Sequence, residues 1–239
     1  MGFDRSAENY LRSSDHAVGS DLEYFEKYFA GKKFQKALDI ACAAGHFGAS
    51  FPAELIYTAD YSFNMLKTAR DSFGFDMPVR TRGEFLPFLS DTFDLVGCRI
   101  AMHHFTNPCL FMNDVFRVLK TGGYFVLIDS VVGFEDAELN KIELIRDTTH
   151  RRSFKVEEVE GMALAEGFHL EDSDLFYKEH IFDEWARRLN PTEEQYRSTV
   201  QAFLDMPDKV KAELRLKTDG KNITSYTDKK AVFIFRKST

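Results

Sequence analysis

Three histidines of the chain stand where a side chain could take up or release a proton. His103 and His104 are adjacent in MHHFTNP, just past an apolar run of strand length, and His150 lies in RDTTHRR. Histidine titrates close to neutral pH, so each is a candidate general base. Because neighbouring residues point in different directions, we expect His104 rather than His103 to face a substrate. The alternatives are capping of the next helix through backbone contacts by both adjacent histidines, and a solvated helix end for His150.

Candidates for binding a substrate lie in the second half of the chain. Arg146 or Arg151 could bind an acidic substrate, and complementary cations at a helix end are the alternative. Trp185, Phe182 and Phe203 could form an apolar wall for an aromatic or prenylated substrate. Their alternative is a core stripe at helical spacing.

The stretch LDIACAAGHFG (38–48) has the composition of a cofactor-binding turn. A strand ends near Ala41, and the small residues that follow would let the backbone approach a ligand closely. Asp39 could hold the amides of the loop or meet a cofactor amine. Asp60 ends the next apolar run about twenty residues later, where a carboxylate can accept hydrogen bonds from two ribose hydroxyls. This spacing favours a nucleoside cofactor, with plain packing of small residues as the alternative.

Short apolar runs must position these residues. Near-continuous apolar runs are typical of parallel strands that helices bury on both faces. Amphipathic segments at 62–72 and 107–119 separate the runs, and this alternation predicts right-handed βαβ units in a doubly wound sheet. Two further strands are expected at 167–177 and 231–237. The four apolar runs span residues 36–43, 54–60, 92–101 and 123–132.

About fifty residues rich in helical signals separate the two late strands. So long an insertion is unusual for a connection, which indicates a lid or a partner-binding surface, or else a packing layer over the sheet edge. No linker divides the chain, so we expect a single domain over residues 1–239. Its expected parts are N-terminal cap helices in 1–35, a cofactor-binding core in 36–130, a substrate or lid region in 131–230 and a last strand in 231–237.

The composition of the chain narrows its partners. A net charge of −7 and a pI of about 5.6 leave no basic footprint for nucleic acid or an anionic membrane. The three cysteines lack C-x-x-C spacing, which argues against disulfides and zinc, and we expect no metal. The polar N-terminus predicts neither a signal peptide nor membrane insertion, and hence a cytoplasmic location. We expect a small-molecule substrate, and a homodimer stays open.

In their order along the chain, four motifs resemble those of the class I S-adenosylmethionine-dependent methyltransferases. The branch they resemble most is that of the ubiquinone/menaquinone C-methyltransferases (methyltransferase type 11). The motifs are LDIACAAGHFG, YTADYSFNMLKTAR, GEFLPFLSDTFDLVGCRIAMHHFTNP and RVLKTGGYFVLID, and they cover roughly residues 36–130. The resemblance implies an α/β, Rossmann-like sheet of seven strands in the order 3-2-1-4-5-7-6, with helical lid insertions. Strand 7, at residues 231–237, would be antiparallel.

The resemblance also implies S-adenosylmethionine as cofactor, S-adenosylhomocysteine as its product, and a set of residues around it. Asp39, Ala41 and Gly45 would line the methionine end. Asp60 would take the ribose hydroxyls, with Tyr61 against the adenine. The other implied members of the site are Glu84 and Phe85 near the base, Arg99 and Ala101 under the sulfonium, and Met65.

Two departures from the family pattern bear on this site. The family usually has glycine at the positions of Ala43 and Ala44, and aspartate at the position of Arg82. An alanine held at positive φ is strained by about 1 kcal/mol. Arginine offers only donors where the aspartate accepts from the adenine amino group. Arg82 could stack on the base, or turn to solvent while Glu84 substitutes.

The function we expect is methyl transfer from S-adenosylmethionine to a small organic acceptor, such as a quinone-like or phenolic ring or a carboxylate. This reaction needs a nucleophile about 3 Å from the methyl carbon, in a pocket that excludes water. The alternative is a degenerate protein of the same fold that serves as a non-catalytic binding or scaffold subunit. A nicotinamide-dependent oxidoreductase is disfavoured because LPFLSDTFDLV and RVLKTGGYFVLID have no role in dinucleotide binding.

Overall fold

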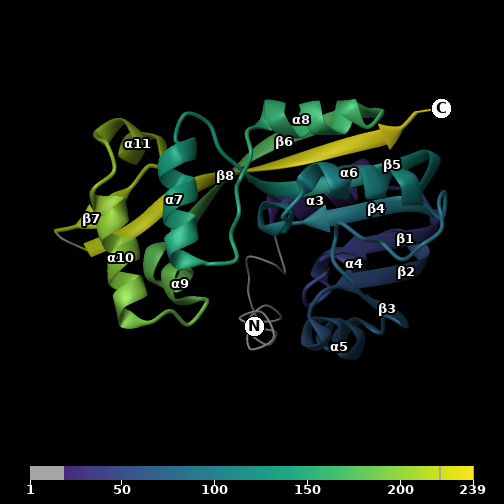
Figure 1. The fold of residues 1–239 in the computed structure, drawn as a ribbon, viewed down its shortest axis with the longest axis horizontal. Coiled ribbons are helices and arrows are strands. Elements are labelled where there is room, and N and C mark those ends of the chain that lie inside the picture. The colour runs from purple at the N-terminus through teal and green to yellow at the C-terminus, as the bar shows by residue number, and fades with distance from the viewer. Residues whose placement is uncertain (1–18, 221, 239) are drawn as a thin grey trace.

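One mixed β-sheet runs through the length of the molecule in the computed structural model, which describes residues 19–220 and 222–238 (Figure 1). Its strands lie in the order β3-β2-β1-β4-β5-β8-β6, and the short β7 pairs with β8. The pairs among β1 to β5 are parallel, whereas β8 runs antiparallel to β5 and β6. The predicted order and antiparallel strand are confirmed. Because β7 is additional, the predicted seventh strand is β8.

Helices and strands alternate through the first half of the chain, as its apolar runs predict. The strands are β1 (Phe34–Ile40), β2 (Ala53–Asp60), β3 (Met77–Arg80), β4 (Phe93–Arg99), β5 (Leu119–Val131), β6 (Phe168–Ile181), β7 (Lys217–Asp219) and β8 (Asn222–Lys237). The helices are α3 (Ser20–Tyr28), α4 (His46–Ala49), α5 (Phe63–Phe73), the 3-10 helix η2 (Met102–His104), α6 (Pro108–Val118), α7 (Asp136–Arg146), α8 (Val156–Ala165), α9 (Phe182–Arg187), α10 (Glu193–Leu204) and α11 (Asp208–Glu213). The part of the expected cap helices within residues 1–18 lies outside the described residues.

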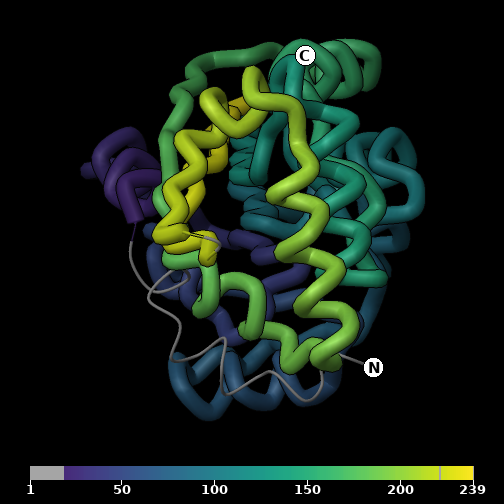
Figure 2. Tube along the Cα trace, turned by 90° about the vertical axis from the view of Figure 1, so that its left-hand side faces the viewer, coloured from purple at the N-terminus to yellow at the C-terminus, as the bar shows by residue number. Residues whose placement is uncertain are grey.

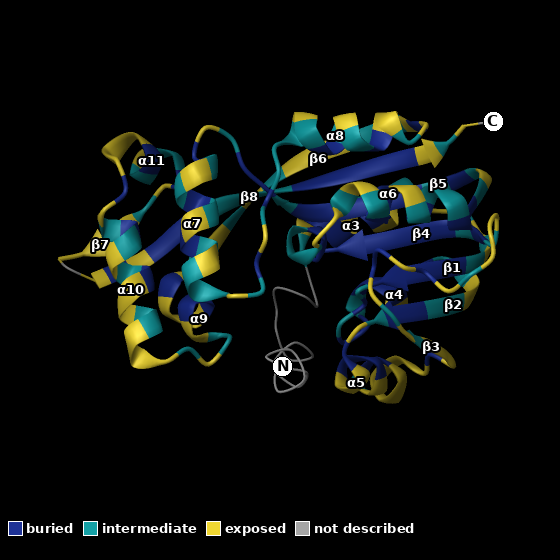
Figure 3. Cartoon of the chain, viewed as in Figure 1, coloured by how far each residue is buried: buried dark blue, intermediate teal, exposed yellow. Residues whose placement is uncertain are grey.

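The central strands are buried on both faces, as Figure 3 shows, because their apolar runs leave no polar face for solvent. In β5, Phe125 and Leu127 face the layer of α6 and α8, while Val126 and Ile128 face the layer of α3 and α4. All four side chains are fully buried. Each contributes at most about 1.5–3 kcal/mol to folding by leaving water.

Local signals in the sequence set the ends of the helices beside the sheet. Ser62 caps α5 by accepting the amide hydrogen of Met65, and Gly74 ends that helix in the left-handed region at φ 73°. Asn107 caps α6 by accepting the amide hydrogen of Leu110, with Pro108 in the first turn. The two helices predicted around 62–72 and 107–119 therefore form within a residue of their expected limits.

The two late strands are longer than predicted and reach past the rest of the sheet. β6 continues to Ile181 and β8 begins at Asn222, and they pair as an antiparallel ribbon over this outer part. α9, α10, α11 and β7 follow one another at the outer end of the ribbon, and α7 packs against α10 (Figures 1 and 2). We call these elements together with the outer ribbon the lobe.

The lobe has an apolar core of its own. Phe182, Trp185, Phe203 and Tyr226 pack together there and are at most 3% exposed. The first residues of β8, NITSYTDKK, are too polar to be recognised as a strand, and they become one because β6 and the lobe helices cover them. None of the helices in the described ranges is both long and apolar enough to cross a lipid bilayer.

Candidate active site

A cavity of about 270 Å³, here called the main cavity, lies at the carboxyl ends of β1, β2 and β4. In open sheets with parallel strands, ligands bind at this edge. Its wall comes from the turns after β1 and β4, the end of β2 and the loop after β3. The sequence-predicted residues that line it are Ala41, Asp60, Tyr61, Met65, Glu84, Ala101 and His104.

The turn after β1 is built from residues in the left-handed region. Ala41, Ala43 and Gly45 have φ values of 53°, 46° and 96°, whereas Ala44 has a negative φ. Ala43 is therefore the departure from glycine that strains the backbone, by about 1 kcal/mol. Gly45 lines none of the cavities described here, and a Cβ on it would lie 2.8 Å from the Phe75 ring. The glycine at position 45 is therefore explained by the close packing of the Phe75 ring.

Two aspartates hold this turn in shape. Asp60 accepts the amide hydrogen of Ala43 at 3.0 Å through Oδ2 and that of Ser62 at 2.7 Å through Oδ1. Asp39 accepts the amide hydrogen of Gly48 at 2.8 Å. Burial raises the pKa of Asp39 to about 8 in spite of that hydrogen bond. Asp39 therefore fixes the start of α4, while Asp60 stands at the cavity wall.

The loop after β3 forms the side of the main cavity where the resemblance places the adenine. The guanidinium carbon of Arg82 lies 5.4 Å from the centroid of the Tyr61 ring. Glu84 is buried, and its Oε1 accepts the amide hydrogen of Thr106 at 2.8 Å, so this oxygen holds the loop. Phe85 is 61% exposed and is absent from the lining of the main cavity. The structure thus places Phe85 apart from the other predicted residues.

Arg99 lies beneath the turn and is paired with a residue that the sequence did not single out. Its Nε donates to Asp21 Oδ2 at 2.7 Å, and Lys230 Nζ lies 3.4 Å from the same oxygen. Burial alone would raise the pKa of Asp21, but the two cations outweigh it and lower that pKa. Arg99 and Asp39 line a smaller cavity of about 40 Å³ beside the main one. Nothing in the sequence around Asp21 signals this pairing.

Ile100, directly after β4, lines all three of the cavities described here. Its φ is 54°, an outlier for a β-branched residue, and its amide hydrogen bonds to the carbonyl of Ile128 at 2.7 Å. Such strain costs of order 1–3 kcal/mol and persists only where the surroundings impose it. The backbone is therefore held at the point where the cavities meet.

A second cavity of about 100 Å³, here called the polar chamber, lies between the core sheet and the lobe. It shares Ile100 and His104 with the main cavity. Four histidines line its wall, and three of them lie together: the ring centroid of His103 is 4.1 Å from that of His104 and 5.5 Å from that of His150, while His180 lies beside Asp228. The charged residues in its wall, apart from the histidines, are Arg146, Lys178, Arg188, Lys230, Glu143, Asp147 and Asp228.

The three rings differ in charge because of their surroundings. Burial alone would lower the pKa of His103, but Asp129 outweighs it with its charge and a hydrogen bond, so that pKa is raised. Burial and the charge of His103 lower the pKa of His104 to about 3 and that of His150 to about 4. At neutral pH His104 and His150 are therefore uncharged. Within the described ranges, no set of three or more His, Cys, Asp or Glu side chains could hold a metal ion.

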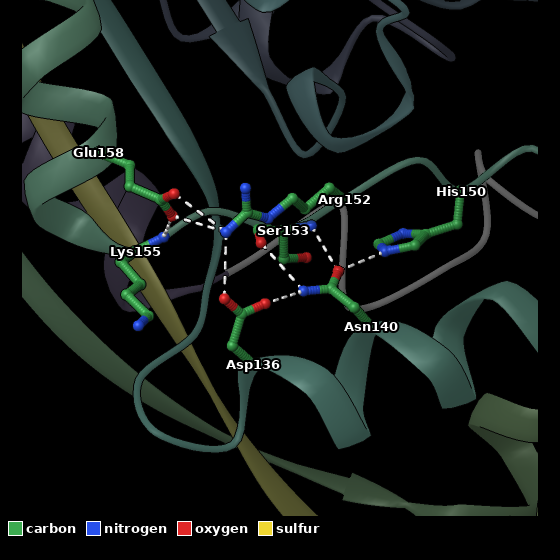
Figure 4. A network of polar contacts seen from close by, with 7 residues as sticks. All are labelled: Asp136, Asn140, His150, Arg152, Ser153, Lys155 and Glu158. Atoms are coloured by element: carbon green, nitrogen blue, oxygen red, sulfur yellow. Dashed lines mark hydrogen bonds and ion pairs between the residues drawn. The ribbon is translucent and has the colours of Figure 1, made fainter.

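Figure 4 shows the network that holds His150. Its Nε2 lies 2.8 Å from Asn140 Oδ1, which also accepts the amide hydrogen of Ser153 at 2.7 Å. Asn140 Nδ2 donates to Asp136 Oδ1 at 2.7 Å, which fixes which end of the amide is the acceptor. The neutral ring therefore carries its proton on Nε2. His150 is 2% exposed, so the alternative of a solvated helix end is wrong.

Arg146 is the one of the two candidate arginines that reaches the polar chamber. Its guanidinium carbon lies 4.2 Å from the Trp185 ring centroid, and Nη1 lies 3.7 Å from Glu143 Oε2. Arg151 is exposed and is not part of the chamber wall. Phe182 and Phe203 lie in the lobe core, as their helical spacing indicated, and do not form an apolar substrate wall.

The comparisons with known proteins agree with this fold and cavity. Residues 38–127 match the methyltransferase domain family. The chain is 29% identical over 197 residues to YcgJ of Bacillus subtilis, an uncharacterized methyltransferase, with 78% of each chain covered. Its structure superposes on BH2331 of Bacillus halodurans, assigned to the methyltransferases, with a TM-score of 0.87 and 30% identity over 92% of this chain and 100% of that one.

The chain belongs to the class I S-adenosylmethionine-dependent methyltransferases. Two further relatives carry named activities. The ubiquinone/menaquinone C-methyltransferase UbiE of Haemophilus ducreyi is 30% identical over 109 residues, which cover 41% of this chain and 42% of UbiE. The arginine-hydroxylase NDUFAF5 of Danio rerio is 32% identical over 138 residues, which cover 55% of this chain and 40% of that protein. Membership therefore fixes the class of enzyme and leaves its acceptor open.

Proposed function

We propose that this enzyme binds S-adenosylmethionine in the main cavity and methylates a small organic acceptor held in the polar chamber. The observation that carries the proposal is that the two cavities share His104 and Ile100. A ligand in each would meet at these residues. Class I methyltransferases require such contact between the two reactants.

The residues around the main cavity fit the cofactor. Asp60 would accept from the ribose hydroxyls, Tyr61 and Arg82 would lie near the base, and Ala41 and Ala101 would allow close approach of the backbone. The extra methyl of Ala43 leaves the cavity open at about 270 Å³. When bound, the cofactor supplies a methyl group on a positively charged sulfur.

The chamber side chains would position the acceptor. At neutral pH the His104 ring is uncharged and can accept a hydrogen bond from an acceptor hydroxyl or amine, although its low pKa makes it a weak base. His103 and Asp129 would keep their charges behind it, and the lobe covers the chamber from outside. The contribution of the protein would thus be orientation and exclusion of water more than proton removal.

Calorimetric titration with S-adenosylhomocysteine tests the cofactor half of the proposal. Wild type should bind in the micromolar range, and Asp60→Asn should weaken binding by about tenfold or more, because it replaces an acceptor of the ribose hydroxyls. Asp76→Asn, at an exposed carboxylate, is the matched control and should bind like wild type. Equal affinity for the two variants would contradict the assigned role of Asp60.

The strain at Ala43 and the cation at Arg82 favour a second candidate, a binding or scaffold subunit that has lost the cofactor. It predicts no binding of S-adenosylhomocysteine at millimolar concentration, so the same titration separates the two candidate functions.

Three expectations from the sequence stay predictions: the cytoplasmic location, the homodimer and the division of the chain into a cap, a core, a lid region and a last strand.

A further inference from the structure

Arg146 brings unused hydrogen-bond donors to the wall of the polar chamber. Its side chain is 10% exposed, and in the described part of the chain Nε and Nη1 have no hydrogen-bond partner. The nearest carboxylate, that of Glu143, stands 3.7 Å from Nη1, too far for a hydrogen bond. A guanidinium does not lose its proton in proteins, so its charge and its donors remain in the chamber. Such a group calls for an anionic ligand.

The guanidinium of Arg146 packs on an aromatic ring, and the backbone of the same residue is tied to α10. It stacks on Trp185 at 4.2 Å, and the side-chain amide of Gln195 donates to the carbonyls of Ile145 and Arg146 at 3.0 and 2.9 Å. These bonds tie the end of α7 to α10 inside the lobe. An arginine fixed in this way loses little conformational entropy when it binds a planar anion.

Acidic side chains close to Arg146 disfavour a second negative charge beside its guanidinium: Glu143 Oε2 lies 3.7 Å from Nη1, and Asp147 lines the same wall. Asp147 already accepts hydrogen bonds from Thr149, and Asp228 Oδ2 lies 3.0 Å from His180 Nε2. The acidic members of the wall would repel a dianion such as phosphate. The cations of the wall are Arg146, Lys178, Arg188 and Lys230, to which His103 adds its charge, and its acids are Glu143, Asp147 and Asp228.

We propose that the methyl acceptor carries a single carboxylate, and that Arg146 binds it. This inference rests on the proposed function, because it names the class of molecule that the polar chamber takes. The carboxylate would lie against the lobe at Arg146, and the atom to be methylated would lie toward His104, where the chamber meets the main cavity. A small chamber with so many charged residues does not suit a prenylated quinone.

The experiment uses the full chain with benzoate as probe and benzamide as a neutral probe of the same shape. Binding is followed by calorimetry and by the NMR signal of the arginine Nε–H groups, with and without saturating S-adenosylhomocysteine. We expect benzoate to bind about tenfold more tightly than benzamide. The Nε–H signal of Arg146 is identified as the one that disappears in the spectrum of Arg146→Gln, and benzoate should shift this signal in wild type. Equal binding of the two probes, or a tighter fit of inorganic phosphate than of benzoate, would overturn the inference.

Variants locate the binding group. Arg146→Gln should lose about tenfold in benzoate affinity, and Arg146→Lys, which keeps the charge without the planar fork, should lose less. Arg197→Gln removes the same charge from an exposed position on α10 and should bind benzoate like wild type. Loss in Arg197→Gln as large as in Arg146→Gln would contradict the site. If Arg146→Gln does not fold, the comparison of benzoate with benzamide on wild type still decides.

The same titrations separate this inference from the proposed function. Binding of S-adenosylhomocysteine without any preference for benzoate would overturn the carboxylate site and leave the cofactor site in place. If benzoate binds but S-adenosylhomocysteine does not bind at any concentration, the assignment of the carboxylate to a methyl acceptor is overturned.

Discussion

Asp129 holds His103 with both of its carboxylate oxygens. Oδ1 lies 2.5 Å from the ring Nδ1, and Oδ2 accepts the backbone amide hydrogen of His103 at 3.0 Å. The pair joins η2 to the end of β5 and keeps a buried positive charge beside two further histidines. Because that charge repels a second one, it adds to burial in lowering the pKa values of His104 and His150.

The first prediction concerns the charges of these rings. In an NMR titration of histidine side chains, His103 should stay protonated above pH 6.5, since its pKa is raised. His104 and His150 should stay neutral down to about pH 5, because their pKa values are lowered to about 3 and 4. Protonation of all three rings near pH 6.5 would show that they do not interact.

The second prediction concerns stability in acid. The unfolded chain protonates His150 near pH 6.5, but the folded chain does so only near pH 4, so stability is lost as the pH falls between these values. His150→Gln removes this loss and should gain about 2 kcal/mol relative to wild type on going from pH 7 to pH 4.5. Denaturant unfolding at several pH values measures it, with His169→Gln, at an exposed histidine of β6, as control. Parallel curves for His150→Gln and wild type would contradict the prediction.

The third prediction separates the two alanines of the cofactor turn. Ala43→Gly should stabilise the fold by about 0.5–1 kcal/mol, because Ala43 has a φ of 46° and glycine adopts that region without strain. Ala44→Gly should destabilise it by about 1 kcal/mol, because Ala44 is 1% exposed at negative φ and loses a buried methyl group. Urea unfolding followed by the fluorescence of Trp185, the single tryptophan, measures both. Effects of the same sign would refute the assigned geometry.

The fourth prediction concerns the cation at the adenine side. Arg82→Asp should tighten S-adenosylhomocysteine binding by about threefold or more, since it restores an acceptor for the adenine amino group beside Tyr61. Arg70→Asp makes the same exchange on the exposed face of α5 and serves as the control. Weaker binding in Arg82→Asp would instead assign Arg82 a stacking role on the base.

The fifth prediction tests the buried ion pair below the cofactor turn. Asp21→Asn leaves Arg99 and Lys230 without their shared carboxylate and should cost about 3 kcal/mol of unfolding free energy. Because the pKa of Asp21 is lowered, its contribution is present above pH 3.8 and is lost as the pH falls through the folded pKa. Asp76→Asn, at an exposed carboxylate, should change the unfolding free energy little by comparison. Equal losses in both variants would show that the pair contributes nothing specific.

The sheet, and the position of Asp60, His103 and His104 at one of its edges, could be predicted from the sequence for the same reason. Strands buried on both faces leave long apolar runs, and the carboxyl ends of parallel strands share one edge. Asp60 ends one such run, and His103 and His104 follow another, so their closeness follows from the order of the strands. The caps Ser62 and Asn107 are local signals and mark their helices directly.

The parts that could not be predicted depend on pairing between distant segments. Asp21 and Arg99 are 78 residues apart, and neither stands in a pattern that points to the other. Arg146 reaches the polar chamber because the lobe folds back over the end of β5. The hydrophobic periodicity of the lobe sequence alone does not show this arrangement. The resemblance implies Phe85 near the base together with Glu84, yet Phe85 is 61% exposed and does not line the main cavity.

A single strand, β8, pairs with β5 and β6 in the core and continues into the lobe, where it contributes Tyr226 to the apolar core. Residues 182–220 therefore lie between two strands that pair with each other, and the segment leaves the ribbon after Ile181, which pairs with Ser225. Related enzymes could exchange this segment without disturbing the turn after β1. For protein engineering, the ribbon offers two splice points for an exchange that replaces Trp185 and Arg188 of the polar chamber and keeps Arg146 and the three clustered histidines.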